Sequence, residues 1–201
     1  MRRKPGKILM TIGLLLIAAA FLLMTYNIRE SKKAEESSKE ILEQISDDQN
    51  HDETSERADK KPLYELYPDM EMPVVTIDGI DYIGILKIPS LGIELPVAKE
   101  WNYPNLRRSP CRYEGSVYSR DIIIAGHNYS RHFGGLKTLS PGETVVFSDV
   151  EHNTFSYQID SFEVIPGTAV EDMQNGEWDL TLFTCTYGGR SRIAVRCRLV
   201  D

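Results

Sequence analysis

Three side chains suited to acyl transfer stand at the ends of strand-like runs that lie far apart in the sequence. His127 follows the continuous apolar run DIIIAG, Cys185 ends the alternating run DLTLFTC, and Arg192 opens the final run RIAVRCRLV. A thiolate can attack a carbonyl carbon, an imidazolium can protonate the leaving amine, and a fixed cation or backbone donor can stabilise the oxyanion. Sites tend to form where rigid strands meet loops, so these positions indicate a candidate reaction centre.

Alternation along the run that carries Cys185 predicts which way each side chain points. Thr181, Phe183 and Cys185 share one face of the strand, while Leu182 and Thr184 share the other. Cys185 is therefore expected at the carboxyl end of its strand, on the face opposite Leu182. Taken alone, a cysteine in a strand is most often a small buried hydrophobe, so its type does not by itself make it a nucleophile.

The last run has an apolar face and an arginine-bearing face. Cys197 lies on the apolar face, which predicts a core residue, and Arg192 lies on the opposite face with Arg196 and Arg198. Arg196 and Arg198 are expected either in solvent or along a substrate groove.

An unperturbed cysteine and histidine would rarely hold both reactive forms at pH 7. With ordinary pKa values near 8.5 and 6.5, about 3% of the thiols are thiolates and about 25% of the imidazoles are imidazolium. If the two groups titrate independently, under about 1% of molecules hold both forms. Activity then requires tolerance of that small fraction, or a pKa shift caused by a neighbour such as Arg192.

The elements that position these residues begin after Pro62, where short β-rich runs alternate with turn residues. YIGILKIP and IELPVAKE are expected to form one hairpin, and ETVVFSDV and TFSYQIDSFEVI another around residues 151–153. Short helical pieces are expected near 102–108 and 134–139. About seven or eight strands with only short helices predict a mostly β fold, a closed or nearly closed β-barrel.

The amino-terminal part of the chain carries a membrane signal. Residues 1–7 form a short basic tail, and residues 8–26 form an uncharged apolar run long enough to cross a bilayer as a helix. A cleaved signal peptide is the alternative, but the apolar run continues past its three alanines, which favours a retained transmembrane anchor. The positive-inside rule then predicts a cytoplasmic amino terminus, with residues 30–201 outside the cell.

The next segment, residues 27–61, is highly charged. Apart from Ile41, Leu42 and Ile45 it contains almost nothing apolar, so it cannot offset its own chain entropy by burial. We therefore expect a flexible linker between the membrane and an extracellular catalytic domain at residues 62–201.

An odd number of cysteines outside the cell needs an explanation, because oxidising surroundings favour pairing. A disulfide between Cys111 and Cys197 would leave Cys185 free. The predicted burial of Cys197 and the position of Cys111 in an arginine-rich loop favour unpaired thiols instead.

Three motifs follow one another along the chain: YIGILKIPSLGIELPV, IIIAGHN, and TLFTC with an arginine at the start of the next run. Over about residues 73–200 they resemble the sortases, membrane-anchored cysteine transpeptidases of Gram-positive bacteria. The resemblance implies an eight-stranded sortase-like β-barrel behind one transmembrane helix, with His127, Cys185 and Arg192 as the catalytic set. It also implies cleavage of an LPXTG-like sorting signal after its threonine and transfer of the acyl group to an amine, commonly of a cell-wall precursor.

Further assignments follow from that resemblance. Arg190 also lies close behind the cysteine, but Arg192 begins the alternating run and matches the family position, so Arg190 is a substrate-binding candidate. Thr184 is expected to help shape the oxyanion site, and Arg196 is the third substrate-binding candidate. The chain stops after the final strand and the segment 164–179 is short, which favours a class A-like or D-like member over classes B and C.

Composition and spacing bear on other functions. The net charge is −7 and no basic stripe occurs, so nucleic acid is not an expected partner. The histidines are scattered, with His132 and His152 expected to be structural, and no CxxC or HExxH spacing occurs, so no metal or cofactor is expected. The expected partners are surface proteins with sorting signals, the cell-wall amine and the membrane. A cysteine hydrolase and a non-catalytic membrane-tethered β-barrel that only binds stay open as alternatives.

Overall fold

The β-rich part of the chain forms a single sheet, flanked by one long helix. The structure is a computed structural model that describes residues 5–51 and 61–200. Its strands are β1 (Val75–Ile77), β2 (Ile80–Ile88), β3 (Ile93–Ala98), β4 (Cys111–Glu114), β5 (Ile122–Gly126), β6 (Thr144–Asp149), β7 (Thr154–Pro166), β8 (Leu180–Cys185) and β9 (Ser191–Leu199). Its helices are α1 (Pro5–His51), α2 (Leu63–Leu66), α3 (Tyr103–Arg108) and α4 (Val170–Gln174), with 3-10 turns η1 (Pro89–Leu91) and η2 (Phe133–Thr138).

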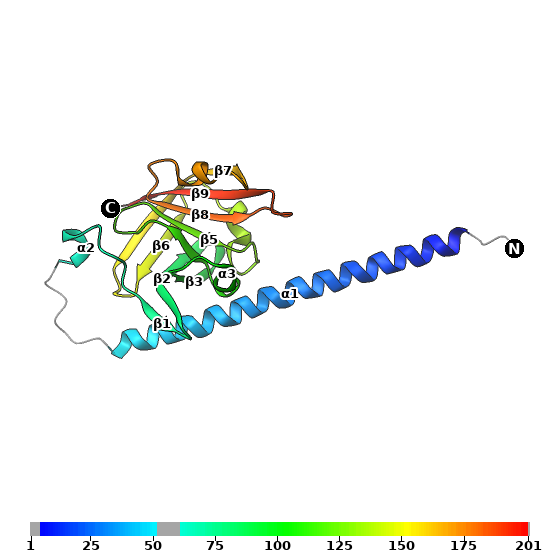
Figure 1. Cartoon of the computed structure of the whole chain (residues 1–201), viewed down its shortest axis with the longest axis horizontal. Helices are drawn as coiled ribbons and strands as arrows, with labels where there is room; N and C mark the ends of the chain where they lie inside the picture. Colours follow the sequence, from blue (N-terminus) through cyan, green and yellow to red (C-terminus); the bar gives the residue numbers. More distant parts are fainter. Residues whose placement is uncertain (1–4, 52–60, 201) are drawn as a thin grey trace.

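The sheet closes on itself into a barrel (Figure 1). Neighbouring strands follow the order β1-β2-β3-β4-β5-β8-β9-β7-β6, and β6 also pairs with β2. The closure therefore joins eight strands and leaves β1 outside it, paired with β2 alone. Two pairings are parallel, β3 with β4 and β5 with β8. The predicted eight-stranded barrel is confirmed.

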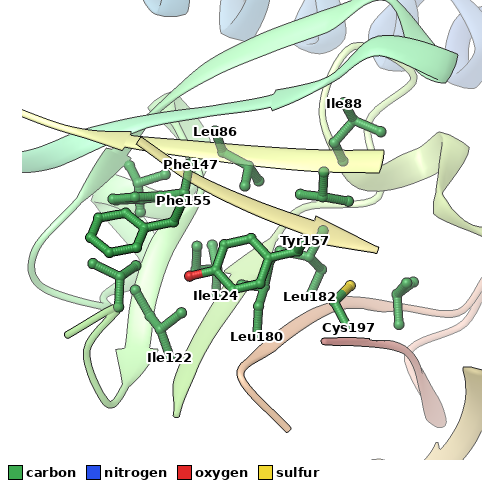
Figure 2. Close-up of a cluster of buried hydrophobic side chains, with 14 of the residues drawn as sticks. Leu86, Ile88, Ile122, Ile124, Phe147, Phe155, Tyr157, Leu180, Leu182 and Cys197 are labelled. Atoms are coloured by element: carbon green, nitrogen blue, oxygen red, sulfur yellow. The ribbon is translucent and has the colours of Figure 1, made fainter. Parts of the chain in front are cut away.

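The barrel interior is filled by the apolar faces of its strands. Figure 2 shows part of this core, in which the sulfur of Cys197 lies among aliphatic and aromatic side chains. Cys197 is fully buried, as the alternation of the last run predicts. The labelled core residues are Leu86, Ile88, Ile122, Ile124, Phe147, Phe155, Tyr157, Leu180, Leu182 and Cys197.

The predicted hairpins and helical pieces are present. β2 pairs with β3 across η1, and β6 pairs with β7 around residues 151–153. The piece expected near 102–108 is α3, whose first turn is capped because the Asn105 backbone N–H donates to Asn102 Oδ1 at 2.8 Å. The piece expected near 134–139 is η2.

The structure differs from the flexible linker expected over residues 27–61. α1 continues without a break from Pro5 to His51, so the charged residues after Tyr26 extend the apolar helix (Figure 1). Residues 52–60 lie outside the described residues. The basic tail expected at 1–7 is described only from Pro5 onward.

A stripe of small and apolar side chains explains why this part of α1 is ordered. The stripe recurs every three or four residues, which places its members on one face of a helix, and every member is buried. Ile41 and Ile45 pack with Ile77 and Tyr82 of the β1–β2 hairpin and Leu106 of α3. The sequence contained this pattern, but two of its positions are serines, which hid it among polar residues. The stripe consists of Ser31, Ala34, Ser38, Ile41 and Ile45.

The first part of α1 behaves differently. Its apolar side chains, such as Leu9, Leu15 and Phe21, are exposed, and it projects away from the barrel (Figure 1). α1 contains a stretch long and apolar enough to cross a membrane, with a mean hydropathy of 2.6. It is therefore a candidate single membrane span.

Candidate active site

Strand register brings the three predicted catalytic residues into one row. In the parallel pair β5–β8, Gly126 lies opposite Thr184, so His127 and Cys185 follow at neighbouring strand ends. In the antiparallel pair β8–β9, Cys185 lies opposite Arg192. Histidine, cysteine and arginine thus occupy adjacent positions across three strands at one end of the barrel.

Cys185 lies on the outer face of the barrel. Leu182 belongs to the interior core, whereas Phe183 packs against apolar clusters outside the barrel wall. Cys185 shares the face of Phe183 by strand alternation and is only half-buried. The opposite faces that the sequence assigns to Leu182 and Phe183 are confirmed.

The three cysteines differ in their surroundings, and all are free thiols. Burial raises the pKa of Cys111 to about 12 and that of Cys197 to about 12, so both stay protonated and inert. Cys185 is the cysteine that solvent can reach. The Asn128 side-chain amide donates to the Cys185 backbone carbonyl at 3.1 Å, which joins the loop after His127 to the end of β8.

A glycine and a phenylalanine fix the strand end before His127. A Cβ added at Gly126 would meet the Phe133 ring at 2.4 Å, so the two residues pack in direct contact only because position 126 lacks a side chain. The Phe133 backbone N–H donates to the His127 carbonyl at 3.1 Å. The His127 ring itself lies beside Tyr129, with ring centroids 4.8 Å apart.

The surroundings of His127 disfavour its charged form. Burial is the main cause that lowers the pKa of His127, and repulsion by Arg107 of α3 adds to it. The imidazolium is therefore scarcer at neutral pH than for an unperturbed histidine. Any mechanism that uses a thiolate with an imidazolium then operates through a small fraction of the molecules.

The two arginines that follow Cys185 occupy different places. Arg192 is half-buried and donates from Nη1 to the carbonyls of Gly189 at 3.0 Å and Ser191 at 3.2 Å. Arg190 lies in the β8–β9 turn with an exposed side chain, while its carbonyl accepts from the Gly167 N–H at 2.9 Å. Arg192 is thus the arginine beside Cys185 on the outer face.

A small pocket opens next to this row. Its volume is about 100 Å³, and its lining is mostly apolar. One wall comes from the segment between β7 and β8, which includes α4, and the other from β4 and β8. Such a pocket can hold an aliphatic side chain of a peptide whose neighbouring carbonyl reaches the thiol. The lining residues are Tyr113, Pro166, Gly167, Ala169, Val170, Met173, Phe183 and Arg192.

Arg196 is neither in solvent nor along a substrate groove, the two places expected for it from the sequence. Its side chain is 1% exposed and donates to the Glu163 carboxylate at 2.8 Å and to the Thr181 hydroxyl at 3.1 Å. It also donates to the carbonyls of Asp172 at 2.7 Å and Met173 at 2.9 Å, both in α4. Alternation placed Arg196 on the outer face correctly, but α4 covers that face, so Arg196 holds the pocket wall instead of contacting a substrate.

Thr184 has a structural role beside the site. Its hydroxyl is buried and donates to the Gly126 carbonyl at 2.8 Å, inside the barrel. This bond joins β8 to β5 directly before Cys185 and His127. The side chain therefore points away from the face on which an oxyanion would form.

His132 was expected to be structural and is fully buried. Burial is the main cause that lowers its pKa to about 4. Its Nε2 lies 3.4 Å from the Ser38 hydroxyl of α1. Within the described residues, no group of three or more histidine, cysteine, aspartate or glutamate side chains is arranged to hold a metal ion.

Comparison with known proteins gives a consistent family assignment. The family model described as Sortase domain matches residues 86–200. The chain is similar to Sortase A of Bacillus anthracis, with 32% identity over 127 residues, which are 59% of this chain and 59% of that protein. The chain thus matches about three fifths of the length of this relative.

Solved structures show the same fold. A Clostridium perfringens Sortase D5 transpeptidase matches with a TM-score of 0.58 and 19% identity, over 85% of this chain and 99% of the other. Sortase A of Listeria monocytogenes matches with a TM-score of 0.53 and 22% identity, over 60% and 88% of the two chains. Sortase C1 of Streptococcus agalactiae gives 0.53 and 22%, over 60% and 68%.

Proposed function

The chain belongs to the sortase family, and on that premise we propose that it is a cysteine transpeptidase with His127, Cys185 and Arg192 as its catalytic residues. The observation that carries the proposal is the register of β5, β8 and β9, which pairs Cys185 with Arg192 and places His127 directly after the Gly126–Thr184 pair. The accessibility of Cys185, in contrast to the two buried thiols, supports it further.

The first half of the proposed reaction is acylation of the enzyme. The Cys185 thiolate attacks the carbonyl carbon of the threonine in an LPXTG-like sorting signal and forms a tetrahedral intermediate. Arg192 stabilises the negative charge that develops on the carbonyl oxygen. The C–N bond then breaks, the His127 imidazolium donates its proton to the leaving amine, and a thioacyl-enzyme remains.

The second half transfers the acyl group. A primary amine attacks the thioester carbon, neutral His127 accepts the proton that the amine loses, and Cys185 leaves as a thiolate. The product is a new amide between the surface protein and the amine, which we propose belongs to a cell-wall precursor. The enzyme returns to its starting state, with imidazolium and thiolate restored.

The pocket beside Arg192 supports a peptide substrate. Its apolar lining and its volume of about 100 Å³ suit the aliphatic side chain at the start of an LPXTG-like signal. Arg196 fixes one wall through α4 before a substrate arrives. Relatives and structural neighbours include class A, C and D sortases, and the class A-like or D-like assignment remains a prediction.

We further propose that α1 anchors the enzyme in the cell membrane, with the amino terminus in the cytoplasm and the catalytic domain outside. The apolar part of α1 supports a single span. The basic residues at 2–4 and 7 support the orientation. Protease treatment of intact cells tests it, because only the part of the chain after the apolar run should be degraded.

Incubation of the full chain in detergent with a sorting-signal peptide and a glycine-based amine tests the activity. A transpeptidase forms the ligated peptide, a cysteine hydrolase forms only the cleaved acid, and a binding module leaves the peptide intact. Mass spectrometry separates the three products. Cys185→Ala is the matched control, which should abolish both the product and the thioacyl intermediate.

A further inference from the structure

Helix α1 joins the membrane segment to the barrel over a very short distance. The apolar run ends at Tyr26, and the buried stripe begins at Ser31. Five residues of α-helix advance about 7.5 Å. Because the helix is continuous here, the barrel is held at a fixed height above the apolar segment.

Among the described residues, the hydrogen bond between α1 and the barrel that lies nearest the apolar segment is beside the active site. The Ser31 hydroxyl lies 2.9 Å from that of Ser130, three residues after His127. Arg131 follows and pairs with Glu35 of α1 at 3.3 Å. Farther along α1, Ile41 contacts the β1–β2 hairpin and α3. The loop after His127 is therefore the part of the barrel that meets α1 closest to the membrane segment.

The ends of β8 and β9 next to this loop also point toward the apolar segment of α1. Figure 1 shows the β8–β9 turn directed along α1 toward its amino-terminal half. The β6–β7 turn lies at the other end of the barrel, because β7 runs from that turn to Pro166, opposite Ser191. The active-site end of the barrel thus faces the apolar segment of α1, and the β6–β7 turn faces away from it.

The surface at this end suits a lipid headgroup layer. Tyr187 is 85% exposed, and Lys137 Nζ lies 5.4 Å from the centre of its ring. The two loops here, 127–138 and 186–191, contain no acidic residue, although the whole chain carries a net charge of −7. Their basic residues are Lys137, Arg190 and Arg131, of which Arg131 pairs with Glu35 of α1. Exposed tyrosine rings are favoured at both membrane interfaces, and basic side chains are favoured at surfaces that carry anionic lipid.

We propose that α1 acts as a rigid stem that holds the active-site end of the barrel in the anionic headgroup layer, with Tyr187 and Lys137 in contact with lipid. The headgroup region extends about 5–8 Å beyond the hydrocarbon on each side, which matches the advance from Tyr26 to Ser31. The consequence for catalysis rests on the proposed function: substrates anchored in the same bilayer meet the thiol without leaving its surface.

A depth measurement tests the placement without any activity. The full chain carries Cys185→Ala with either Tyr187→Cys or Glu151→Cys, labelled with a fluorophore and inserted into vesicles of phosphatidylglycerol and phosphatidylcholine. The buried thiols of Cys111 and Cys197 should not react with the label. Headgroup-nitroxide lipids should quench the probe at 187 several-fold more than the probe at 151, in the β6–β7 turn. Equal quenching at both positions overturns the proposal.

An insertion in α1 tests the rigid stem. Seven helical residues added between Asn27 and Ile28 raise the barrel by about 10.5 Å and nearly preserve the facing of the stripe. The quenching at 187 should fall to the level at 151, whereas unchanged quenching contradicts a fixed height. Lys137→Glu should lower the quenching at 187 more in anionic vesicles than in neutral ones. An equal decrease in both kinds of vesicle contradicts the anionic lipid contact.

The same insertion separates this inference from the proposed function. Turnover of a sorting signal fused to a membrane-spanning helix should fall about tenfold or more, because the reacting groups are displaced from each other. Turnover of a soluble peptide should stay within about twofold, since the catalytic row is untouched. Equal effects on both substrates contradict the stem. Absence of turnover with the unmodified enzyme contradicts the function and leaves the depth result standing.

Discussion

The active-site end of the barrel and the side of the barrel that packs against α1, called the flank here, each contain a cysteine and a histidine. The surroundings of these residues differ between the two regions. At the site, Cys185 and His127 are half-buried at strand ends. On the flank, Cys111 and His132 are fully buried, and burial lowers the pKa of His132 to about 4. Residue type therefore does not decide function here. Strand ends that remain in contact with solvent keep a thiol and an imidazole available, whereas burial makes the same groups structural.

The largest expected effect comes from replacing one cysteine of each region with alanine and comparing the two variants. Cys185→Ala should reduce ligation by at least about 10³-fold, because the nucleophile is lost, with little change in the free energy of unfolding. Cys111→Ala should instead preserve ligation and lower that free energy by about 1 kcal/mol. Product formation by mass spectrometry and denaturant unfolding measure the two quantities. Residual ligation by Cys185→Ala would place the nucleophile elsewhere.

The next effect distinguishes the two neighbouring arginines at the site. Arg192→Ala should lower kcat/KM by about 10²-fold, the range found when an oxyanion donor is removed. Arg190→Ala is the matched control and should stay within about twofold, since its side chain is exposed in the turn. Steady-state kinetics with the sorting peptide compares them. If the two losses were reversed, Arg190 would be the catalytic arginine.

A third change addresses the flank. Ile41→Ala should lower the free energy of unfolding by about 3 kcal/mol, because a fully buried side chain is removed from the contact between α1 and the barrel. Glu43→Ala, exposed on the same helix, should change it by less than about 0.5 kcal/mol. Denaturant unfolding in detergent provides the measurement. A flexible linker in solution would make both substitutions equally mild.

Acid should also weaken the flank. His132 titrates near pH 6.5 when unfolded and near pH 4 when folded, so the unfolded chain binds more protons between these values. Stability should fall as the pH drops through this window, by about 2 kcal/mol at pH 5. The groups around the ring are Ser38 and Ala34 of α1, with Tyr129 and His127. In His132→Gln this part of the decline should disappear from unfolding curves measured between pH 5 and 7; an identical decline in both proteins would assign it to other groups.

Local sequence pattern predicted where most residues of the proposed catalytic row lie in their strands. The alternation of Phe183 and Cys185 fixes which face each occupies, and the apolar run before His127 is long enough to identify a buried strand. Which strands become neighbours was not visible in those patterns. The resemblance to the sortases supplied the expectation that His127, Cys185 and Arg192 meet.

The features that the sequence did not predict depend on contacts between segments that are distant in the chain. Arg196 points outward, as alternation requires, but α4 covers it and supplies two carbonyl acceptors. No local sequence pattern indicates that α4 covers Arg196. The helix after Tyr26 was missed for a related reason, because Ser31 and Ser38 are buried only where the barrel accepts them. In the sequence, a serine that is buried against another segment cannot be distinguished from a serine in solvent.

The smallest expected effect probes how His127 works. Arg107→Ala removes a repulsion and so raises the pKa of His127, although burial remains the larger cause of its lowering. If the thiolate and imidazolium together are the active form, more molecules hold it. The maximal kcat/KM should then rise, by less than about threefold, and the acid limb of its pH profile should move to higher pH.

Arg108→Ala is the matched control for that change. It removes the next arginine of α3, which pairs with Asp78 at 3.0 Å and does not act on the imidazole. Its pH profile should stay in place. If neutral His127 instead deprotonates a thiol, Arg107→Ala should leave the rate at pH 7 unchanged or lower it. The direction of this small change therefore decides which protonation state of the site performs the attack.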